Sequence, residues 1–194
     1  MESNLAYQYE YPEELINGEA VAMSPSPAHN HIWVANNLNF IFGNYLRGKK
    51  CRVYPDGFDV HLSKKDIFKP DMMVVCDRDK IKPNGIYGAP DLVVEVLSRS
   101  TAHRDKGYKK DTYAKSGVRE YWLVDPGNES IEVYLNADGV FTLDNIYFNH
   151  YPEWELERLS EAERAAIPTH FRCSLFGDLE IALADVFDGL LPSS

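Results

Sequence analysis

The sequence predicts a fold of the α/β or α+β class, in which a central mixed β-sheet is flanked by helices. Predicted strands alternate with predicted helices, which is typical of such sheets. Two of the strands, within residues 68–76 and 89–97, are apolar at most positions, as expected for strands buried on both faces. The 194 residues, 44% of them hydrophobic, suffice for one sizeable core, so we expect a single domain over residues 1–194.

The elements before these two strands follow from turn signals and periodicity. An Asn-Gly pair predicts a hairpin within residues 15–23, and the Ser-Pro pairs after it break the chain. Apolar residues recur at steps of three and four over residues 31–46, which indicates an amphipathic helix that Gly48 ends. Short strands are expected at residues 51–54 and 58–62.

The elements after the two buried strands begin with a second helix. Ser and Thr residues near position 100 can cap a helix that runs to about Lys115, and Gly117 can terminate it. Residues 120–125 predict a further buried strand. The remaining expected elements are two hairpin strands at residues 131–135 and 139–147 and a short helix near residues 178–189.

The charge of the chain is −10, from 20 Lys and Arg against 30 Asp and Glu. A domain that coats nucleic acid nonspecifically is usually basic, so this balance argues against such a partner. Binding depends on local fields, however, and residues 99–119 hold seven Lys or Arg against two Asp. The chain therefore combines one basic segment with an acidic remainder of net charge −15.

The sequence also indicates a cytoplasmic protein. No apolar run approaches the roughly 20 residues of a membrane helix, and residues 1–7 lack the features of a signal peptide. Cys51, Cys76 and Cys173 are an odd number without a CxxC motif, which argues against disulfides and zinc knuckles. Cys76 follows two valines, and we expect it to be a small buried apolar side chain.

Glu95 lies within the apolar run of residues 92–97 and is the first residue that needs an explanation. A carboxylate inside such a strand is costly unless it is paired, hydrogen-bonded or bound to a metal. One interpretation is an ion pair with a Lys or Arg of the core. The other is a metal site, which requires a second carboxylate nearby.

Two aspartates, each preceded by proline at the start of a predicted strand, could share a cation with Glu95. Asp91 lies on the same strand, four residues or about 13 Å of backbone away. Since Mg²⁺ needs its ligand oxygens at about 2.0–2.1 Å, that separation is too large. Asp71 can lie beside Glu95 if the two strands are neighbours. We therefore expect Asp71 and Glu95 to bind the metal, and Asp91 to be a turn or cap residue.

A longer pattern resembles a known family. Pro70-Asp71 and Glu95 resemble the signature of the PD-(D/E)XK nuclease superfamily, and the chain is similar over nearly its whole length to the restriction-endonuclease-like Uma family. This resemblance implies a restriction-endonuclease-like core and a Mg²⁺- or Mn²⁺-dependent endonuclease that hydrolyses phosphodiester bonds in DNA. Its most specific parts are residues 89–98, the series Asp105, Lys109 and Tyr113, and residues 117–126.

The chain departs from the superfamily pattern at Leu97, where the lysine of the motif would stand. The resemblance implies that Lys109, on the following helix, fills the same space. Asp105, Lys109 and Tyr113 are spaced at four residues, so they share one helical face. The alternative is an ordinary surface pair of Asp and Lys beside a core tyrosine.

The resemblance also implies roles for these residues. Asp71 and Glu95 hold the ion, and Lys109 orients or helps to deprotonate the attacking water, or stabilises charge on the phosphate. Three basic residues close to Lys109 in sequence could contact flanking phosphates without selecting a sequence. They are Arg104, Lys106 and Lys110.

Two further residues stand at positions similar to the family, with alternatives open for each. Glu19 either completes the acidic cluster from the first strand or is a solvated charge beside a turn. His31 either caps or packs the first helix or takes part in catalysis. Tyr121 and Trp122 are expected in the core, as aromatic pairs in strands usually are.

A metal-dependent DNA endonuclease, acting as a homodimer, is the expected function. The main rival is a catalytically weak or inactive nuclease fold that binds nucleic acid or a protein partner, which the acidic charge and Leu97 favour. A phosphoesterase acting on a small nucleotide is a third possibility. The joint presence of Asp71, Glu95 and Lys109 favours an enzyme, because a buried acidic pair has no obvious use in an inactive core.

Overall fold

A large mixed sheet forms the centre of the computed structural model, which describes residues 13–23 and 27–192. Its strands, in spatial order, are β12 (Val140–Phe148), β11 (Ser130–Ala137), β10 (Glu120–Asp125), β9 (Leu92–Val96), β6 (Met72–Val75) and β3 (Arg52–Pro55). Only β9 and β10 are parallel; every other neighbouring pair in this sheet is antiparallel. The predicted mixed sheet is confirmed, whereas residues 1–7 and the predicted break at residues 24–26 lie outside the described residues.

The parallel pair requires a crossover, which the predicted second helix supplies. It consists of α2 (Ala102–Arg104), a π-helical turn η2 (Asp105–Lys109) and α3 (Lys110–Ser116). Gly117 ends α3 with a φ of 96°, the left-handed conformation that glycine adopts without steric cost. The helix was predicted to be continuous, but within η2 it is kinked at Gly107, whose backbone (φ −113°, ψ −110°) is not helical; η2 contains Asp105 and Lys109.

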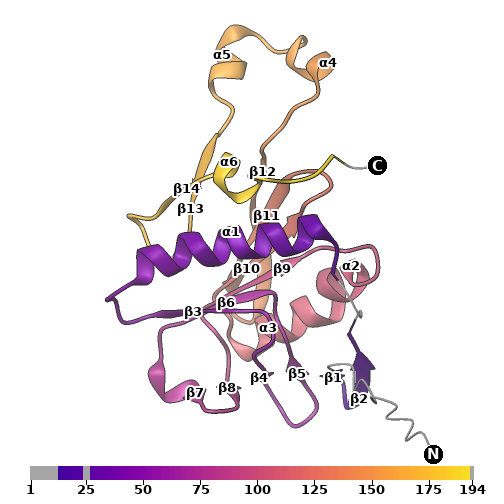
Figure 1. The fold of residues 1–194 in the computed structure, drawn as a ribbon, viewed down its shortest axis with the longest axis vertical. Helices are drawn as coiled ribbons and strands as arrows, with labels where there is room; N and C mark the ends of the chain where they lie inside the picture. The colour runs from indigo at the N-terminus through magenta and orange to yellow at the C-terminus, as the bar shows by residue number, and fades with distance from the viewer. Residues whose placement is uncertain (1–12, 24–26, 193–194) are drawn as a thin grey trace, which may run out of the picture.

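Helices and short strands cover both faces of the large sheet (Figure 1). One face packs against α1 (His29–Leu46) and, from the C-terminal part, β13 (His170–Arg172), β14 (Glu180–Ala182) and α6 (Leu183–Val186). The other face packs against α3 and part of a smaller sheet. That sheet has the order β2 (Glu19–Ala22), β1 (Glu13–Ile16), β5 (Ile67–Phe68), β4 (Val60–His61), β8 (Gly85–Tyr87) and β7 (Ile81–Lys82), with η1 (Arg78–Lys80) before β7.

Strand alternation decides which face Glu95 meets. Val94 and Val96 belong to the core on the α1 side, and Val93 belongs to the core on the α3 side. Glu95 therefore points towards α3 and the smaller sheet. The crossover helix and the strand thus present their candidate site residues to the same layer.

The smaller sheet is the main addition to the predicted fold. Its strands have two to four residues, too few to produce a periodic pattern. The expected strand at residues 68–76 is divided into β5 and β6 by the turn that contains Asp71. Two short helices, α4 (Glu153–Leu156) and α5 (Glu161–Ala165), lie on an arm of residues 149–169 that projects from the body (Figure 1).

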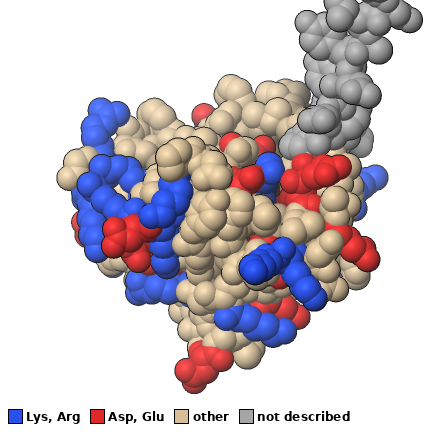
Figure 2. Space-filling view, turned by 90° about the horizontal axis from the view of Figure 1, so that it is seen from below, with Lys and Arg blue, Asp and Glu red and all other residues tan. Residues whose placement is uncertain are grey.

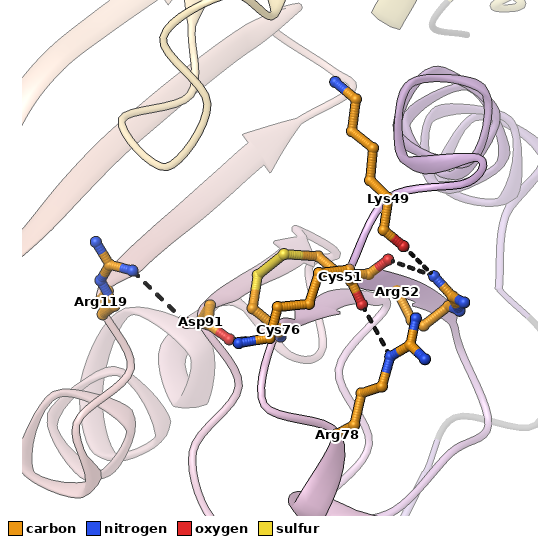
Figure 3. Close-up of a disulfide and its surroundings, with 8 residues drawn as sticks. Lys49, Cys51, Arg52, Cys76, Arg78, Asp91 and Arg119 are labelled. Atoms are coloured by element: carbon orange, nitrogen blue, oxygen red, sulfur yellow. Dashed lines mark hydrogen bonds and ion pairs between the residues drawn. A yellow bond between two sulfur atoms is a disulfide. The ribbon is translucent and has the colours of Figure 1, made fainter.

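The prediction that the chain has no disulfide is wrong. Cys51 and Cys76 are joined by a disulfide between the ends of β3 and β6 (Figure 3). The register of these strands pairs Arg52 with Val75, so the two cysteines lie opposite each other as the next pair. Counting cysteines gives no information on strand pairing, and the odd one, Cys173, is buried and free.

None of the helices in residues 13–23 and 27–192 is long and apolar enough to cross a membrane.

Candidate active site

The structure brings Asp71 beside the strand of Glu95. Strands β6 and β9 are antiparallel neighbours, with Met72 opposite Val94. Asp71 is one residue before Met72 and Glu95 one after Val94, so they continue the same register. The backbone N–H of Val96 donates a 2.6 Å hydrogen bond to Asp71 Oδ2. The two carboxylates therefore leave adjacent strands at the same end of the sheet.

Asp91 lies at the opposite end of these strands. Its Oδ2 accepts a 2.7 Å hydrogen bond from the backbone N–H of Cys76, and its Oδ1 is 3.7 Å from a guanidinium nitrogen of Arg119 (Figure 3). The side chain thus caps the entrance of β9 and the exit of β6. It is not part of the cluster around Glu95.

Lys109 is buried against three carboxylates. Its Nζ lies 2.8 Å from Glu95 Oε1, 3.0 Å from Glu14 Oε1 and 3.5 Å from Asp105 Oδ1. Tyr113, one turn further on, donates a 3.0 Å hydrogen bond from its hydroxyl to Glu95 Oε1. The predicted face of Asp105, Lys109 and Tyr113 is thus buried against Glu95 rather than exposed as a surface pair.

The π-helical turn η2 fixes the placement of this face. The Tyr121 hydroxyl donates a 2.9 Å hydrogen bond to the carbonyl oxygen of Asp105. On the other side, the Tyr108 hydroxyl donates a 3.0 Å bond to Asp66 Oδ1, which also accepts from the backbone N–H of Asn17. The turn, which is kinked at Gly107, is therefore tied both to β10 and to the hairpin that carries Glu14.

Glu14 is the acidic residue of the first hairpin that joins the cluster, and it was not predicted. It is buried on β1, and its Oε1 accepts a 2.8 Å hydrogen bond from the backbone N–H of Lys69 as well as the bond from Lys109. Glu19 lies on β2 and is exposed, so the structure does not bring it to the cluster. Alternation could have indicated that Glu14 is buried, because it shares a strand face with Ile16, which packs on the core, but it could not have shown which residues Glu14 meets.

His31 lies at the start of α1 with its Nε2 3.3 Å from Asp71 Oδ2. It does not cap the helix, since Ala28 is the N-cap residue. Burial alone would lower the pKa of His31, but the hydrogen bond to Asp71 and the charges of Asp71 and Asp56 outweigh it and raise the pKa. The pKa of Asp56 is also raised, by burial and by the charge of Asp71.

The buried cluster of Lys109, Glu95, Glu14 and Asp105 contains more acidic than basic groups. Burial raises the pKa of Glu95 despite the opposing charge of Lys109. Burial would lower the pKa of Lys109, but the charges of Glu95, Glu14 and Asp105 raise it, so the ammonium stays protonated at neutral pH. One ammonium thus faces three carboxylates, with Asp71 close by. A proton or an added cation would reduce this excess.

A cleft of about 900 Å³ gives access to these groups. Asp71, Glu95, Lys109 and His31 all line it. Its basic lining residues include Arg104 and Lys106, for which phosphate contacts were predicted, and also Arg99 and Lys69, for which none were predicted. Lys106 bonds Glu132 at 2.8 Å. Lys110 does not line the cleft, and its Nζ lies 3.8 Å from the centre of the Tyr134 ring.

The negative charge of the molecule is concentrated away from these residues. Residues 1–126 contain 17 acidic and 17 basic side chains, whereas residues 127–194 contain 13 acidic and three basic ones. Five of those acidic residues lie on the 149–169 arm. The face seen from below carries both charges: Lys and Arg gather on its left and front, and Asp and Glu lie among them as well as on its right (Figure 2). The net charge of −10 therefore does not describe the body around the cleft.

The oxygen atoms of Asp71 and Glu95 are suitable ligands for a hard divalent cation. Asp71 and Glu95 offer carboxylate oxygens from adjacent strands, which are the ligands that Mg²⁺ and Mn²⁺ prefer. In the described part of the chain, no three His, Cys, Asp or Glu side chains form a complete metal site. Mg²⁺ usually takes only one or two carboxylates and completes its shell with water and substrate phosphate. Two carboxylates at the wall of a cleft meet that requirement.

Comparison with known proteins adds a family and a fold. Residues 3–166 match the Uma2 family, described as "Putative restriction endonuclease". Two uncharacterized proteins of Synechocystis sp. are similar: slr1290 is 31% identical over 135 residues (68% of this chain, 70% of the relative), and sll1609 is 27% identical over 125 residues (62% and 70%).

A solved structure is similar over most of its length. It is the crystal structure of "a putative nuclease belonging to DUF820" from Anabaena variabilis, with a TM-score of 0.67 over 90% of this chain and 89% of that chain. At 18% identity, this similarity shows the fold alone.

Proposed function

Because the chain belongs to the Uma2 family of restriction-endonuclease-like proteins, we propose that it is a metal-dependent nuclease that hydrolyses phosphodiester bonds in DNA. The observation that carries the proposal is the buried Lys109, held 2.8 Å from Glu95 at the wall of a cleft that Asp71 also lines. Two carboxylates and a lysine around one cleft match the functional groups of the nuclease signature, with the lysine supplied by the crossover helix instead of position 97.

Asp71 and Glu95 are the residues that would hold Mg²⁺ or Mn²⁺. Such an ion supplies Lewis-acid polarisation of the scissile phosphate. His31 lies against Asp71 Oδ2, and the Val96 N–H bonds the same atom, so the carboxylate is oriented before any ligand arrives. The Tyr113 hydroxyl does the same for Glu95 Oε1.

Lys109 acts as a charge and hydrogen-bond donor in this proposal rather than as a base. Three carboxylates raise its pKa, so it remains an ammonium at neutral pH. An ammonium at the cleft wall can donate to a phosphate oxygen as negative charge develops there, or orient the attacking water. Moving towards the substrate would exchange one of its carboxylate contacts for a phosphate contact.

The basic lining of the cleft would hold the flanking phosphates. Arg104 and Arg99 line the cleft, and Lys106 can join them by giving up its bond to Glu132. Contacts of this kind add affinity and set the orientation of the strand, with little choice of sequence. Lys110 lies outside the cleft lining and would contribute at longer range.

The second candidate function is an inactive nuclease fold that binds DNA or a protein partner. The observation in its favour is that Lys109 already occupies Oε1 of Glu95 and of Glu14, as in a core ion pair. Under this alternative the cluster would be structural, and no cation would be needed to balance it.

The experiment that separates the two combines Mn²⁺ titration calorimetry with cleavage of linear and circular DNA, with and without EDTA. The variants are Asp71→Asn and Glu95→Gln, and the matched control is Asp91→Asn, which changes the other Pro-Asp pair. We expect saturable Mn²⁺ binding and EDTA-sensitive cleavage in the wild type and in the control, and loss of both in the two site variants. Absence of Mn²⁺ binding and of cleavage in the folded wild type would favour the inactive binder.

A further inference from the structure

A segment near the C-terminus lies beside the first half of α1 (Figure 1). We call residues 186–191 the C-terminal strap. Asn30 and Leu191 exchange two 2.9 Å hydrogen bonds, from Asn30 Nδ2 to the Leu191 carbonyl oxygen and from the Leu191 N–H to Asn30 Oδ1. Two turns further along the helix, the side chain of Asn37 donates to two other carbonyl oxygens of the strap, at 3.1 and 3.0 Å.

Apolar packing anchors the strap to the body of the protein. Val186 and Phe187 are buried in the core on the α1 side of the large sheet, and Leu190 packs against the same core. Between them, Gly189 lies so close to Trp33 that a Cβ added to the glycine would stand 2.1 Å from Trp33 Nε1. The φ of Gly189 is 74°, in the left-handed region, so both the close contact and the backbone favour glycine here.

The first turn of α1 is not capped by its N-cap residue. This residue is Ala28, which has no side-chain oxygen to accept a hydrogen bond, and the turn contains no acidic residue to interact favourably with the helix dipole. The first N–H groups of a helix lack partners within it, so such an end tends to fray. Two side chains of this turn contact the strap instead: Asn30 bonds Leu191, and His29 Nε2 lies 3.3 Å from the carbonyl oxygen of Gly189. The strap thus supplies contacts that a cap would otherwise provide.

The same turn forms part of the cleft wall. Ala28, Asn30 and His31 line the cleft, and His31 Nε2 lies 3.3 Å from Asp71 Oδ2. Displacement of the turn would therefore separate His31 from Asp71. None of residues 186–191 lines the cleft, so the strap can affect the site only through the residues that it holds.

We propose that the C-terminal strap is a positioning element of the candidate active site. It holds the first turn of α1 so that His31 stays against Asp71, and Asn30 and Gly189 are the positioning residues. The effect on the site rests on the proposed function, in which Asp71 is a metal ligand. The family match covers residues 3–166, so the strap lies outside the part of the chain that the family describes. Residues that orient a metal ligand usually change metal affinity, which makes the proposal measurable.

The first test measures whether the strap holds the turn. Gly189→Ala places a Cβ against Trp33 Nε1. Gly48→Ala is the matched control, because Gly48 lies just beyond the other end of α1 with a φ of 77°, and its Cβ would meet no described atom within 4 Å. We expect Gly189→Ala to speed hydrogen exchange of the backbone amides of residues 32–35 by about tenfold, through loss of the strap contacts, and Gly48→Ala to leave it unchanged.

The second test measures Mn²⁺ binding by titration calorimetry. Asn30→Ala should raise the Mn²⁺ dissociation constant about tenfold, the lower end of the range for residues that orient a ligand. Leu191→Pro removes the N–H that bonds Asn30 and leaves the cleft lining intact, so it should weaken binding too. Leu191→Ala keeps this N–H and is the control. A loss of affinity in Asn30→Ala that Leu191→Pro does not reproduce would show that Asn30 acts directly, and would overturn the proposal.

A double variant tests whether the strap acts through His31. In a His31→Ala background, Gly189→Ala should cause no further loss of Mn²⁺ affinity, because the contact that the strap maintains is already absent. Additive losses would overturn the proposal, since the strap would then only support the fold. Unchanged hydrogen exchange in Gly189→Ala would overturn it as well.

The exchange measurement needs neither metal nor cleavage, so the two proposals can fail separately. A folded wild type that binds no Mn²⁺ would contradict the metal-dependent nuclease and, with it, the effect of the strap on the site. Hydrogen exchange would still decide whether the strap holds the first turn of α1.

Discussion

Lys109 is the residue of the candidate site whose contribution to stability can be tested most directly. Its ammonium is almost completely buried and neutralises part of the charge of Glu95, Glu14 and Asp105. Removing one partner of a buried charge pair leaves the others unpaired, which is far more costly than losing a surface pair. The energetic role of Lys109 can therefore be measured apart from any reaction.

We expect Lys109→Met to lower the free energy of unfolding by about 3 kcal/mol at neutral pH, measured by urea denaturation. The cost should shrink as the pH falls, because protonation of Glu95 and Asp105, whose pKa values are raised, removes the unpaired charges. Lys110→Met is the control, since Lys110 is less buried and faces Tyr134. Equal stability of the two variants would contradict the burial argument.

Glu132 offers a second test at the scale of one residue. Burial would raise its pKa, but hydrogen bonds from Lys106 and Tyr134 outweigh it and lower the pKa. A lowered folded-state pKa stabilises the protein above the ordinary Glu value of about 4.3, and this gain is lost as the pH falls through the folded-state pKa. We expect Glu132→Gln to lose this gain at neutral pH and to match the wild type at low pH, in thermal unfolding scans.

The same Glu132→Gln substitution should also strengthen DNA binding, because it releases Lys106 to the cleft. Fluorescence anisotropy with a labelled duplex would measure this change. Glu129→Gln, which alters a nearby acid that contacts His150 and Asn149 rather than the cleft lining, is the control. If both variants strengthen binding equally, the effect is one of overall charge and not of the release of Lys106.

Among the elements, the π-helical turn η2 connects the cluster to its surroundings. Tyr108 links the turn to Asp66, which in turn holds the backbone of Asn17 in the first hairpin. We expect Tyr108→Phe to cost about 1 kcal/mol of stability, the usual value of one hydrogen bond. Hydrogen exchange should be faster in residues 105–109. Tyr87→Phe, which removes a hydroxyl bonded only to Asn84, should leave exchange in the turn unchanged.

The disulfide gives a prediction for the edge of the large sheet. Cys51 and Cys76 are 25 residues apart and join β3 to β6. Closing a loop of this length stabilises a fold by about 3 kcal/mol through the entropy of the unfolded chain. We expect reduction by dithiothreitol to lower the free energy of unfolding by that amount. A Cys51→Ala, Cys76→Ala double variant should unfold alike with and without the reductant.

The elements that could be predicted from the sequence are those whose hydrophobic pattern extends over enough residues to be recognised. Helix α1 follows from its repeat of apolar residues, and β9 and β10 from their apolar runs. Glu95 was identified as a candidate because a buried carboxylate is costly unless it is paired or bound to a metal. Asp71 was preferred to Asp91 because Asp91 lies too far from Glu95 along the same strand. The role of Lys109 came from family resemblance, because nothing in a single Lys within a basic segment distinguishes it from its neighbours.

Other features depend on contacts between distant segments, which local pattern does not contain. Glu14 joins the cluster because β1 pairs with β5, and that pairing rests on strands of two to four residues. The disulfide requires the register of β3 and β6. The irregular turn η2 is kinked at Gly107, whose backbone (φ −113°, ψ −110°) is not helical, and a lone glycine within a helical pattern does not by itself predict a kink.

At the scale of the whole molecule, the net charge of −10 does not describe the part of the protein that forms the cleft. Seventeen acidic residues are balanced by seventeen basic ones up to residue 126, and the excess lies entirely beyond it. An acidic total is thus compatible with a body that binds a polyanion.

This separation makes one part of the protein, formed by residues 127–194, more negative than the rest. The 149–169 arm lies at one end of the molecule (Figure 1), and residues 127–194, to which it belongs, carry the whole excess of negative charge. In the field of a polyanion, such a molecule experiences a torque before any contact is made, and it turns its acidic end away. Its encounters would then be oriented in advance, and added salt, by shortening the range of that field to about 8 Å at physiological ionic strength, would randomise the approach.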